Sequence, residues 1–459
     1  MKDISRLVDS QRKYFNSGET KDIKFRVSQL KKLKKSIKNN EEVILNALCS
    51  YDLKKPAYEA YASEIAIVLK ELEYAIDNVA EWSRPKEFPT PLVQWPSSAM
   101  IYPEPYGVAL IIGPWNYPLQ LMMNPLIGAI AAGNCAILKP SEIAPAASRV
   151  LTDIITDTFE PNYVSVVEGD AVVAQELLSN KFDYIFYTGS TNVGKIVMKC
   201  AAENLTPVTL ELGGKSPCIV DSEVDLKAAA KRIVWGKFFN AGQTCIAPDY
   251  VLANNKIKGE LLNNLAYYVK RFYGNEPWKG HDYARIINKK HYSRLIQLLS
   301  EGSLVIGGDM IESLRYISPT ILTNIKLDSK LMQEEIFGPI LPIIGYNNLE
   351  DAIYFINQKP KPLALYIFSK NKKLQSQVLS QTSSGGVGIN ETLVHFSLLP
   401  SGGVGSSGIG KYHGKASFDT FSHEKGVFDK SLKLDLTTSR FPPYSKSKLL
   451  LLKLLRRFM

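Results

Sequence analysis

The sequence contains few cysteines, five in 459 residues, and no two of them lie close enough together to form a metal-type pair. An odd count at such wide spacing excludes a disulfide framework and predicts no bound metal. The first fourteen residues are polar and lack the apolar core of a secretory signal. The pattern therefore favours reduced thiols in the cytoplasm.

Unbroken apolar runs long enough to span a membrane are also absent. Residues 106–138 carry no charge, but prolines and asparagines interrupt them repeatedly. A lipid-facing helix would leave backbone groups unpaired at these breaks, which excludes a membrane span. The stretch instead predicts a buried strand over 107–113, a helix over 121–132 and a strand over 135–138, typical of a parallel sheet covered on both faces.

Acidic residues are outnumbered by basic ones, and the net charge is +10. Because charges of both signs interleave along most of the chain, we expect no nucleic-acid partner. A lysine cluster at 31–38, spaced by apolar residues, predicts an amphipathic helix with a solvated basic face. A second excess lies in the tail, 436–459, where leucines alternate with basic residues. The alternation covers about thirteen residues, which is too few to span a bilayer, and it predicts peripheral contact with an anionic membrane surface, docking on a partner subunit or simple disorder.

Hydrophobic residues make up 45% of the chain and charged residues 22%, as in folded globular proteins. Beyond residue 138, predicted helices and strands alternate, which indicates an α/β fold with doubly wound parallel sheets. The first series comprises helix 145–159, strand 163–167, helix 171–178, strand 183–187, helix 192–203 and strand 207–212. The second comprises helix 226–239, strand 250–253, helix 259–273 and strands near 304–306 and 363–368.

Two glycine patterns imitate nucleotide-binding motifs. Residues 403–408 match G-x-G-x-x-G, but no adequate strand precedes them and no good helix follows, so we interpret them as a loop near a site or interface. Residues 189–195 match the start of a P-loop, except that Ile196 stands where Ser or Thr should bind magnesium. A P-loop-like nucleotide hydrolase is the alternative that this second match leaves open. The strand–turn–helix context otherwise favours anion binding at Ser190, or a plain capped helix.

Cys245 and Glu211 are the candidate catalytic residues. Cys245 follows a glycine-containing break at the end of a predicted helix, and such loops often carry chemistry. None of the five histidines lies in a recognisable context for activating a thiol, so we consider a carboxylate acting through water. Glu211 ends a predicted parallel strand, where ligand crevices form.

Six motifs resemble the aldehyde dehydrogenase superfamily, in its order, over about residues 20–430. They are PWNYP at 114–118, KPSE at 139–142, YTGST at 187–191, LELGGK at 210–215, GQTC at 242–245 and EEIFGP at 334–339. APDY at 247–250, PKPL at 360–363 and YHG at 412–414 resemble the class 3 branch, which contains fatty and aromatic aldehyde dehydrogenases and a bacterial group acting on an apocarotenoid aldehyde.

The resemblance implies NAD(P)-dependent oxidation of an apolar aldehyde to its acid. Cys245 would form a thiohemiacetal and then a thioester, Asn116 and the Cys245 N–H would hold the oxyanion, and Glu211 would activate water. The cofactor, NAD with NADP also accepted, would be bound by a set of residues spread over the matched motifs. They are Lys139 and Glu142 at the adenosine ribose, Gly189, Ser190 and Gly194 at the pyrophosphate, and Trp115, Glu335 and Phe337 at the nicotinamide side.

The resemblance also implies a domain plan and a homodimer. Residues 1–84 and 106–212 would form a Rossmann-like NAD(P)-binding domain, 213–393 an α/β catalytic domain, and 85–105 with 394–435 a small β bridging arm for oligomerisation. Ser401 departs from the aromatic that the superfamily usually has at this position, so the shape of the substrate pocket does not carry over. A CoA-dependent acylating enzyme and a non-catalytic membrane-surface protein on the same fold are further alternatives, and Glu211 argues against the first of these.

Overall fold

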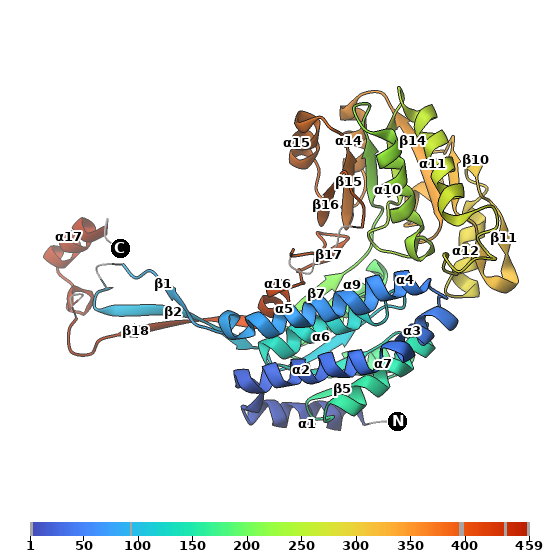
Figure 1. Cartoon of the computed structure of the whole chain (residues 1–459). Coiled ribbons are helices and arrows are strands. Elements are labelled where there is room, and N and C mark those ends of the chain that lie inside the picture. Colours follow the sequence, from blue (N-terminus) through green and yellow to red (C-terminus); the bar gives the residue numbers. More distant parts are fainter. Residues whose placement is uncertain (1–2, 92–93, 394–398, 436–437, 457–459) are drawn as a thin grey trace.

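A computed structural model describes residues 3–91, 94–393, 399–435 and 438–456. Two α/β lobes, each built on its own sheet, lie next to each other, and a long arm projects from the first lobe (Figure 1). This arrangement agrees with the predicted α/β fold class.

The first lobe is built on a six-stranded sheet. Its elements are β3 (Val108–Ile112), α6 (Gln120–Ala132), β4 (Cys135–Lys139), α7 (Pro145–Thr158), β5 (Val164–Val166), α8 (Ala171–Leu178), β6 (Tyr184–Thr188), α9 (Thr191–Glu203), β7 (Val208–Glu211) and the short β17 (Gly408–Ile409). The strand order is β17-β7-β6-β3-β4-β5, and only β17 is antiparallel to its neighbour. From β3 the strands are added on one side as far as β5, and the chain then crosses back to add β6 on the other side of β3. Because the crossovers are right-handed, α6 and α7 lie on the opposite face of the sheet from α8 and α9. The carboxyl ends of β3 and β6 thus meet at a switch point, where open sheets bind ligands.

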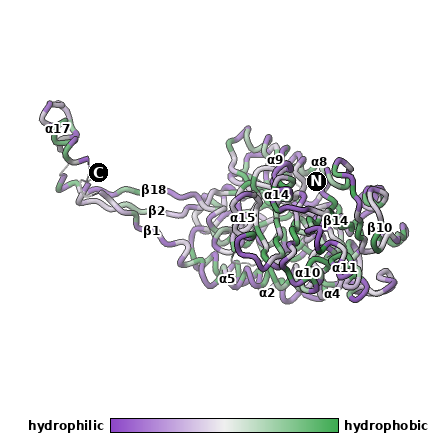
Figure 2. The backbone as a smooth tube through the Cα atoms, turned by 90° about the horizontal axis from the view of Figure 1, so that it is seen from above, coloured by the Kyte–Doolittle hydropathy of each residue, from purple (hydrophilic) through white to green (hydrophobic). Residues whose placement is uncertain are grey.

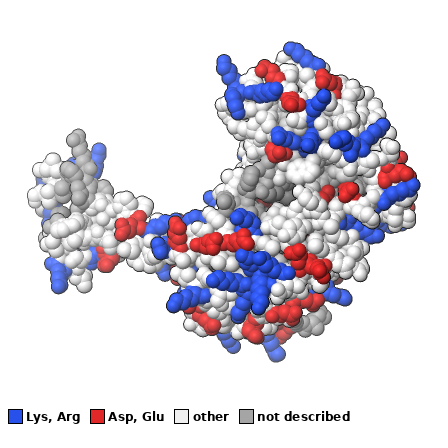
Figure 3. All heavy atoms as spheres, viewed as in Figure 1, with Lys and Arg blue, Asp and Glu red and all other residues white. Residues whose placement is uncertain are grey.

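A second layer of helices covers α6 and α7. It comprises α2 (Ile23–Asn39), α3 (Glu41–Ser50), α4 (Ala57–Ala60), a π-helical turn η2 (Tyr61–Ile65) and α5 (Ala66–Trp82), whereas α1 (Ile4–Asn16) packs on the sheet itself. Leu30, Leu33 and Ile37 of α2 are buried, whereas most lysines of residues 31–38 are exposed. The predicted amphipathic helix is therefore confirmed, and its lysines stand among acidic side chains on the surface (Figure 3).

The second lobe contains a seven-stranded sheet. Its strands are β8 (Pro217–Val220), β9 (Tyr250–Asn254), β10 (Ser303–Ile306), β13 (Thr320–Thr323), β14 (Ile340–Tyr346), β15 (Ala364–Phe368) and β16 (Gly386–Ile389), in the order β10-β13-β14-β9-β8-β15-β16. Side chains alternate between the two faces of a strand. Val251 and Ala253 accordingly pack with α10 (Leu226–Phe238) and α11 (Lys258–Tyr273), while Tyr250 and Leu252 pack with α14 (Leu349–Asn357) and α15 (Lys372–Gln381).

The remaining elements of this lobe lie in its connections. They are α12 (Lys289–Leu298), β11 (Met310–Ile311), β12 (Tyr316–Ile317) and α13 (Lys330–Gln333), and β11 and β12 form a small separate sheet.

The arm is a three-stranded antiparallel sheet of β1 (Lys86–Phe88), β2 (Ser97–Pro105) and β18 (Ser422–Lys430). The helix α17 (Lys446–Leu455) lies at its far end, well away from both lobes (Figure 2). The segment expected in the arm, 394–435, also supplies β17 and α16 (Lys415–Thr420), which pack on the first lobe rather than on the arm. Among the described residues, no helix is long and apolar enough to cross a membrane.

The uncharged stretch 106–138 forms β3, α6 and β4 as predicted, and these three elements are buried throughout. The helix predicted over 226–239 ends one residue earlier, because a tight turn begins at Phe239. Strands β8, β13, β14 and β16 were not predicted. β8 begins at Pro217, β14 contains Pro342, and β13 and β16 span only four residues each, too few for the pattern to distinguish strand from helix.

The side chain of Asn134, just before β4, bonds the residue before β3 and the residue after α16, so its removal tests how these segments pack. Its Oδ1 accepts a hydrogen bond from Gly107 N at 2.9 Å, and its Nδ2 donates to Phe421 O at 2.9 Å. Asn134→Ala leaves both backbone groups buried without this partner, so we expect a loss of about 2–4 kcal/mol in the free energy of unfolding. Urea denaturation measures it, with the exposed Asn204→Ala as the control. A loss no larger than that of the control would contradict the assigned role.

Candidate active site

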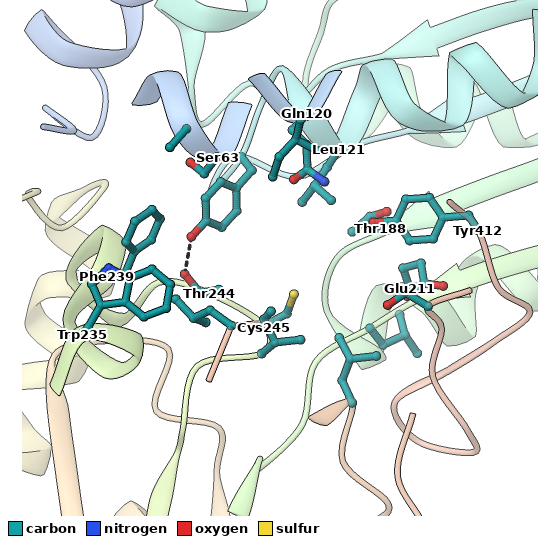
Figure 4. Close-up of a pocket in the computed structure, with 18 of the residues that line it drawn as sticks. Ser63, Gln120, Leu121, Thr188, Glu211, Trp235, Phe239, Thr244, Cys245 and Tyr412 are labelled. Carbon is teal, nitrogen blue, oxygen red and sulfur yellow. Dashed lines mark hydrogen bonds between the residues drawn. The ribbon is translucent and has the colours of Figure 1, made fainter. Parts of the chain in front are cut away.

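A cavity of about 290 Å³ lies where the two lobes meet. Its lining is mostly apolar and aromatic and includes Leu121, Trp235, Phe239, Ile246 and Tyr412. The Cys245 sulfur projects into this cavity, and the Glu211 carboxyl group lies across it (Figure 4). The structure therefore brings together the two residues that the sequence singled out for chemistry.

The loop that carries Cys245 has an unusual backbone. After α10 ends, Asn240 and Ala241 both adopt φ near +52°, a left-handed conformation that is unfavourable for residues with a Cβ. Gly242 follows with φ +73°, and a Cβ there would lie 2.3 Å from the carbonyl oxygen of Gly338. Strain of this kind persists only where the surroundings hold it, and here it aims the thiol at the cavity.

Burial, together with the nearby carboxyl groups of Glu335 and Glu211, raises the pKa of the Cys245 thiol to about 12. The thiol is therefore protonated at neutral pH in the protein without ligands, and a proton acceptor is needed to form the nucleophile.

Asn116 lies behind the cavity wall rather than in its lining. Its Nδ2 donates to the carbonyl of Gln243 at 3.1 Å, two residues before Cys245. An amide nitrogen carries two hydrogens, so this bond accounts for one of them. The neighbouring side chains also meet, because the Tyr117 hydroxyl lies 2.6 Å from Thr244 Oγ1. The loop after β3 and the Cys245 loop are thus joined directly.

Glu211 is the last residue of β7 and is 5% exposed. Its Oε1 has no hydrogen-bond partner among the residues that the structure describes, and the same is true of Thr188 Oγ1, which also lines the cavity. Burial raises the pKa of the Glu211 carboxyl group well above its ordinary value. Two unpartnered polar oxygens in one cavity suit a ligand or water that reaches them there.

The glycine-rich residues 403–408 lead into β17, where Gly408 pairs with Glu211. Gly408 has φ +147°, and a Cβ on it would lie 2.2 Å from the carbonyl oxygen of Leu210. The glycine therefore allows close approach to the strand that carries Glu211, in agreement with the prediction of a loop near a site. Ser401 also lines the cavity and pairs with Tyr412.

The predicted residues for an adenosine ribose lie together after β4. Lys139 is buried, and its Nζ is 2.9 Å from Glu142 Oε2 on a half-exposed side chain. Gly189 and Ser190 join β6 to α9, and Ser190 Oγ accepts from Val193 N at 3.4 Å as a helix cap. Gly194 is buried against Leu212, where a Cβ would meet a methyl carbon at 2.8 Å, so it serves close helix–strand packing.

The predicted nicotinamide-side residues gather at the second lobe. The Trp115 ring lies 5.3 Å from Phe337 and 5.0 Å from His291. Glu335 lies against Gly213, where a Cβ would be only 2.3 Å from its Oε2. Burial and the neighbouring carboxyl group of Asp249 together raise the pKa of Glu335 to about 8.

The segment carrying Glu335 is held by a buried ion pair, which the sequence did not reveal. Lys215 Nζ lies 2.5 Å from Asp249 Oδ2 and also donates to the carbonyls of Leu331 and Glu334. Asp249 Oδ1 accepts from Ile336 N at 2.9 Å. Both residues stand within matched motifs, at 210–215 and 247–250, so their motif membership was the only available signal.

These residues fit a nicotinamide dinucleotide. An ammonium beside a carboxylate can bond vicinal hydroxyl groups, and the N-terminus of α9 presents backbone N–H groups to phosphate. Gly213 leaves the space beside Glu335 that a side chain would fill. Among the described residues, no cluster of His, Cys, Asp and Glu is arranged to hold a metal.

Comparison with known proteins gives a consistent result. Residues 1–427 match the model of the aldehyde dehydrogenase family. The chain is 52% identical over 435 residues to 4,4'-diaponeurosporen-aldehyde dehydrogenase of Staphylococcus aureus, covering 94% of each protein. It is 47% identical over 448 residues to mouse aldehyde dehydrogenase family 3 member A2, covering 97% of this chain and 92% of the relative.

Solved structures agree. A substrate-bound Staphylococcus aureus AldH has a TM-score of 0.97 and 50% identity, covering 99% of this chain and all of that one. Indole-3-acetaldehyde dehydrogenase of P. syringae, solved with NAD⁺ bound, has a TM-score of 0.86 at 26% identity, covering 94% and 89%. A mouse relative described as dimeric and NADP-preferring is 46% identical over 446 residues, covering 96% and 98%.

The raised pKa of Cys245 predicts how its reactivity depends on pH. Without cofactor, alkylation by iodoacetamide should quicken about tenfold per pH unit between about pH 7 and pH 10, because the thiolate fraction rises that steeply below the pKa. Mass spectrometry of the Cys245 peptide measures the rate. N-acetylcysteine, with an ordinary pKa, is the control, and its rate should level off within the range. A plateau for Cys245 below about pH 9 would show that burial does not hold the thiol protonated.

Proposed function

The chain belongs to the aldehyde dehydrogenase family, and from this premise we propose that it oxidises an apolar aldehyde to the carboxylic acid with NAD, NADP being accepted as well. The observation that carries the proposal is the thiol of Cys245 facing the carboxyl group of Glu211 across an otherwise apolar cavity. The carboxylate of Glu142 would repel a 2′-phosphate, which favours NAD over NADP.

We assign each protein group a step of a covalent mechanism, which the cavity shared by Cys245 and Glu211 supports. Cys245, deprotonated through water by Glu211, adds to the aldehyde carbon and forms a thiohemiacetal. The Asn116 amide and the Cys245 backbone N–H stabilise the negative oxygen. The bound nicotinamide supplies the hydride acceptor. Loss of hydride from the thiohemiacetal carbon leaves a thioester on Cys245. Glu211, after releasing the first proton to solvent, takes a proton from the water that hydrolyses this thioester, and its raised pKa makes it a stronger base than an exposed carboxylate.

Three groups of residues would hold the cofactor. Lys139 and Glu142 would bind the adenosine ribose, Gly189 and Ser190 the pyrophosphate, and Glu335 with Trp115 and Phe337 the nicotinamide side. We assign Gly194 a packing role at the same helix, because it lies against Leu212.

The cavity lining supports a long apolar aldehyde as substrate. Aliphatic and aromatic side chains surround the thiol, and Ser401 is small where related proteins usually have an aromatic residue. The relative from Staphylococcus aureus is named for an apocarotenoid aldehyde, and a substrate of that shape is compatible with this lining.

We assign residues 1–84 and 106–212 to the cofactor-binding domain, 213–393 to the catalytic domain, and the arm to a homodimer contact. The arm exposes large apolar side chains, among them Phe88 and Phe428. Such side chains on a projecting sheet favour burial against a second copy. The cytoplasmic location expected from the cysteines remains a prediction.

The alternatives gain no support. A P-loop hydrolase is disfavoured because Ile196 stands where a magnesium-binding Ser or Thr is needed, and Lys195, at the P-loop lysine position, is exposed on α9. A base positioned to activate water makes CoA unnecessary for releasing the product.

Aldehyde oxidation is tested by reduced-nicotinamide absorbance with straight-chain aldehydes of increasing length beside benzaldehyde. Wild type should reduce NAD and favour the longer chains, because the cavity is apolar. Cys245→Ala should lose at least roughly 10³-fold in kcat, since the nucleophile is removed. Cys200→Ala, a half-buried cysteine on α9, is the matched control and should retain full activity. Turnover by Cys245→Ala at the wild-type rate would refute the assignment.

The exposed leucines and lysines of α17 lead us to predict that the tail contacts a membrane surface. Its leucines 449–452 are exposed beside Lys446, Lys448 and Lys453, as in helices that lie on anionic surfaces. The intact chain should co-sediment with phosphatidylglycerol vesicles, and a chain lacking residues 446–459 should not. Phosphatidylcholine vesicles are the control. Equal binding by the truncated chain would exclude this role.

A further inference from the structure

The segment from Lys55 to Ile65 carries three ionisable residues whose side chains are buried beside the active site. Lys55, Glu59 and Glu64 are 2%, 8% and 0% exposed. Buried charges of this kind are rare unless they are paired or functional. None of the three has a place in the chemistry described above, and their partners show what they hold.

Glu64 holds the loop that follows Asn116. Its Oε2 accepts hydrogen bonds from Leu119 N at 2.9 Å and Gln120 N at 3.1 Å, at the start of α6. These N–H groups belong to a helix N-terminus, where a carboxylate is favoured. Its Oε1 pairs with Lys55 Nζ at 2.5 Å, and that ammonium lies 4.0 Å from the centre of the Tyr117 ring.

Glu59 holds the Cys245 loop. Its Oε2 accepts a hydrogen bond from Asn240 N at 2.9 Å, the first of the two left-handed residues. The Asn240 side chain in turn donates to the carbonyls of Asn116 and Gln243, each at 3.2 Å. Glu59 therefore fixes the strained turn and, through it, the approach of the two loops.

The π-helical turn explains how one short segment reaches both loops. Residues five apart lie well apart around an α-helix, since 3.6 residues complete a turn. Within Tyr61–Ile65 the hydrogen bonds instead span five residues, which widens the turn and brings residues 59 and 64 toward one face. Ala62 and Ser63 of the same turn line the cavity, so the segment forms part of the substrate pocket as well.

We propose that Glu59 and Glu64 are positioning residues that hold the two halves of the oxyanion site, the Asn116 loop and the Cys245 loop, in register. The inference rests on the proposed roles of Asn116 and Cys245. Tyr117 and Thr244 brace the same gap through their hydrogen bond. The two carboxyl groups act on the reaction only through the backbone groups that they orient.

Paired variants separate the hydrogen bond from the charge. Burial raises the pKa of Glu59 to about 8, so at neutral pH Glu59→Gln matches its mostly neutral form and keeps an acceptor, whereas Glu59→Ala does not. For Glu64, Lys55→Met with Glu64→Gln keeps the acceptor without an unpaired buried ammonium, and Lys55→Met with Glu64→Ala removes it. Glu73→Ala is the control, because Glu73 is a surface acid on α5 paired with Lys34.

Loss of one oxyanion donor typically costs roughly 10²–10³ in rate, and a displaced donor should cost less. We expect each Ala variant to lose roughly 10–100-fold in the rate of the first turnover, while each Gln variant and Glu73→Ala stay within about threefold of wild type. KM for NAD and the iodoacetamide alkylation rate of Cys245 should stay within about twofold, because neither needs the oxyanion site.

Several outcomes would overturn the inference. Ala variants with first turnovers within about threefold of wild type would do so, as would Gln variants as slow as the Ala variants. Should the Ala variants fail to fold, Glu59→Asp supplies the test, since its shorter side chain withdraws from Asn240, and an unchanged rate would refute the proposal. Failure of the proposed function looks different: wild type would oxidise no aldehyde, or Cys245→Ala would remain active.

Discussion

Desolvation is the constraint on which this site depends. The thiol of Cys245 and the carboxyl group of Glu211 share one mostly apolar cavity, and burial raises the pKa of both. The described residues that line the cavity include no lysine or arginine that could stabilise either group as an ion. Charge that forms during a reaction there must be met by oriented dipoles, which have more effect in such surroundings than in water. The rate of a reaction at this site therefore depends on how accurately the N–H groups that stabilise the developing charge are placed.

The need to place these N–H groups accurately explains why the surrounding structure keeps several features that reduce its stability. Asn240 and Ala241 adopt unfavourable backbone conformations, Glu59 and Glu64 lose hydration, and glycines at 213, 242 and 408 allow backbone and side chains to approach closely. Each feature is unfavourable alone and is maintained by the packing of the two lobes. All of them converge on the loops after β3 and α10, which meet only because the lobes lie against each other.

Local patterns were sufficient to predict much of the fold. The uncharged stretch 106–138 is apolar enough to be buried on all sides, the helix over 171–178 is capped by Asp170, and both form as expected. Cys245 and Glu211 were also predictable, because a glycine break and a strand end mark them in sequence. The roles of Glu59 and Glu64 were not, since their partners lie 181 and 55 residues away and the π-helical turn has no signature in composition. For Gly194 the sequence motif indicated a ligand contact at the pyrophosphate, whereas the contact seen in the structure is packing against Leu212.

The central claim is a covalent route in which Cys245 carries the acyl group and Glu211 releases it. It is tested most directly by Glu211→Gln, mixed with NAD and a long-chain aldehyde and followed by rapid-quench mass spectrometry. The account predicts about one equivalent of reduced cofactor per active site, formed more slowly than in wild type because Cys245 also loses its proton acceptor. The protein should become heavier by the aldehyde less two hydrogens, with the added mass on the Cys245 peptide. Steady turnover at the wild-type rate, with no mass on Cys245, would contradict it.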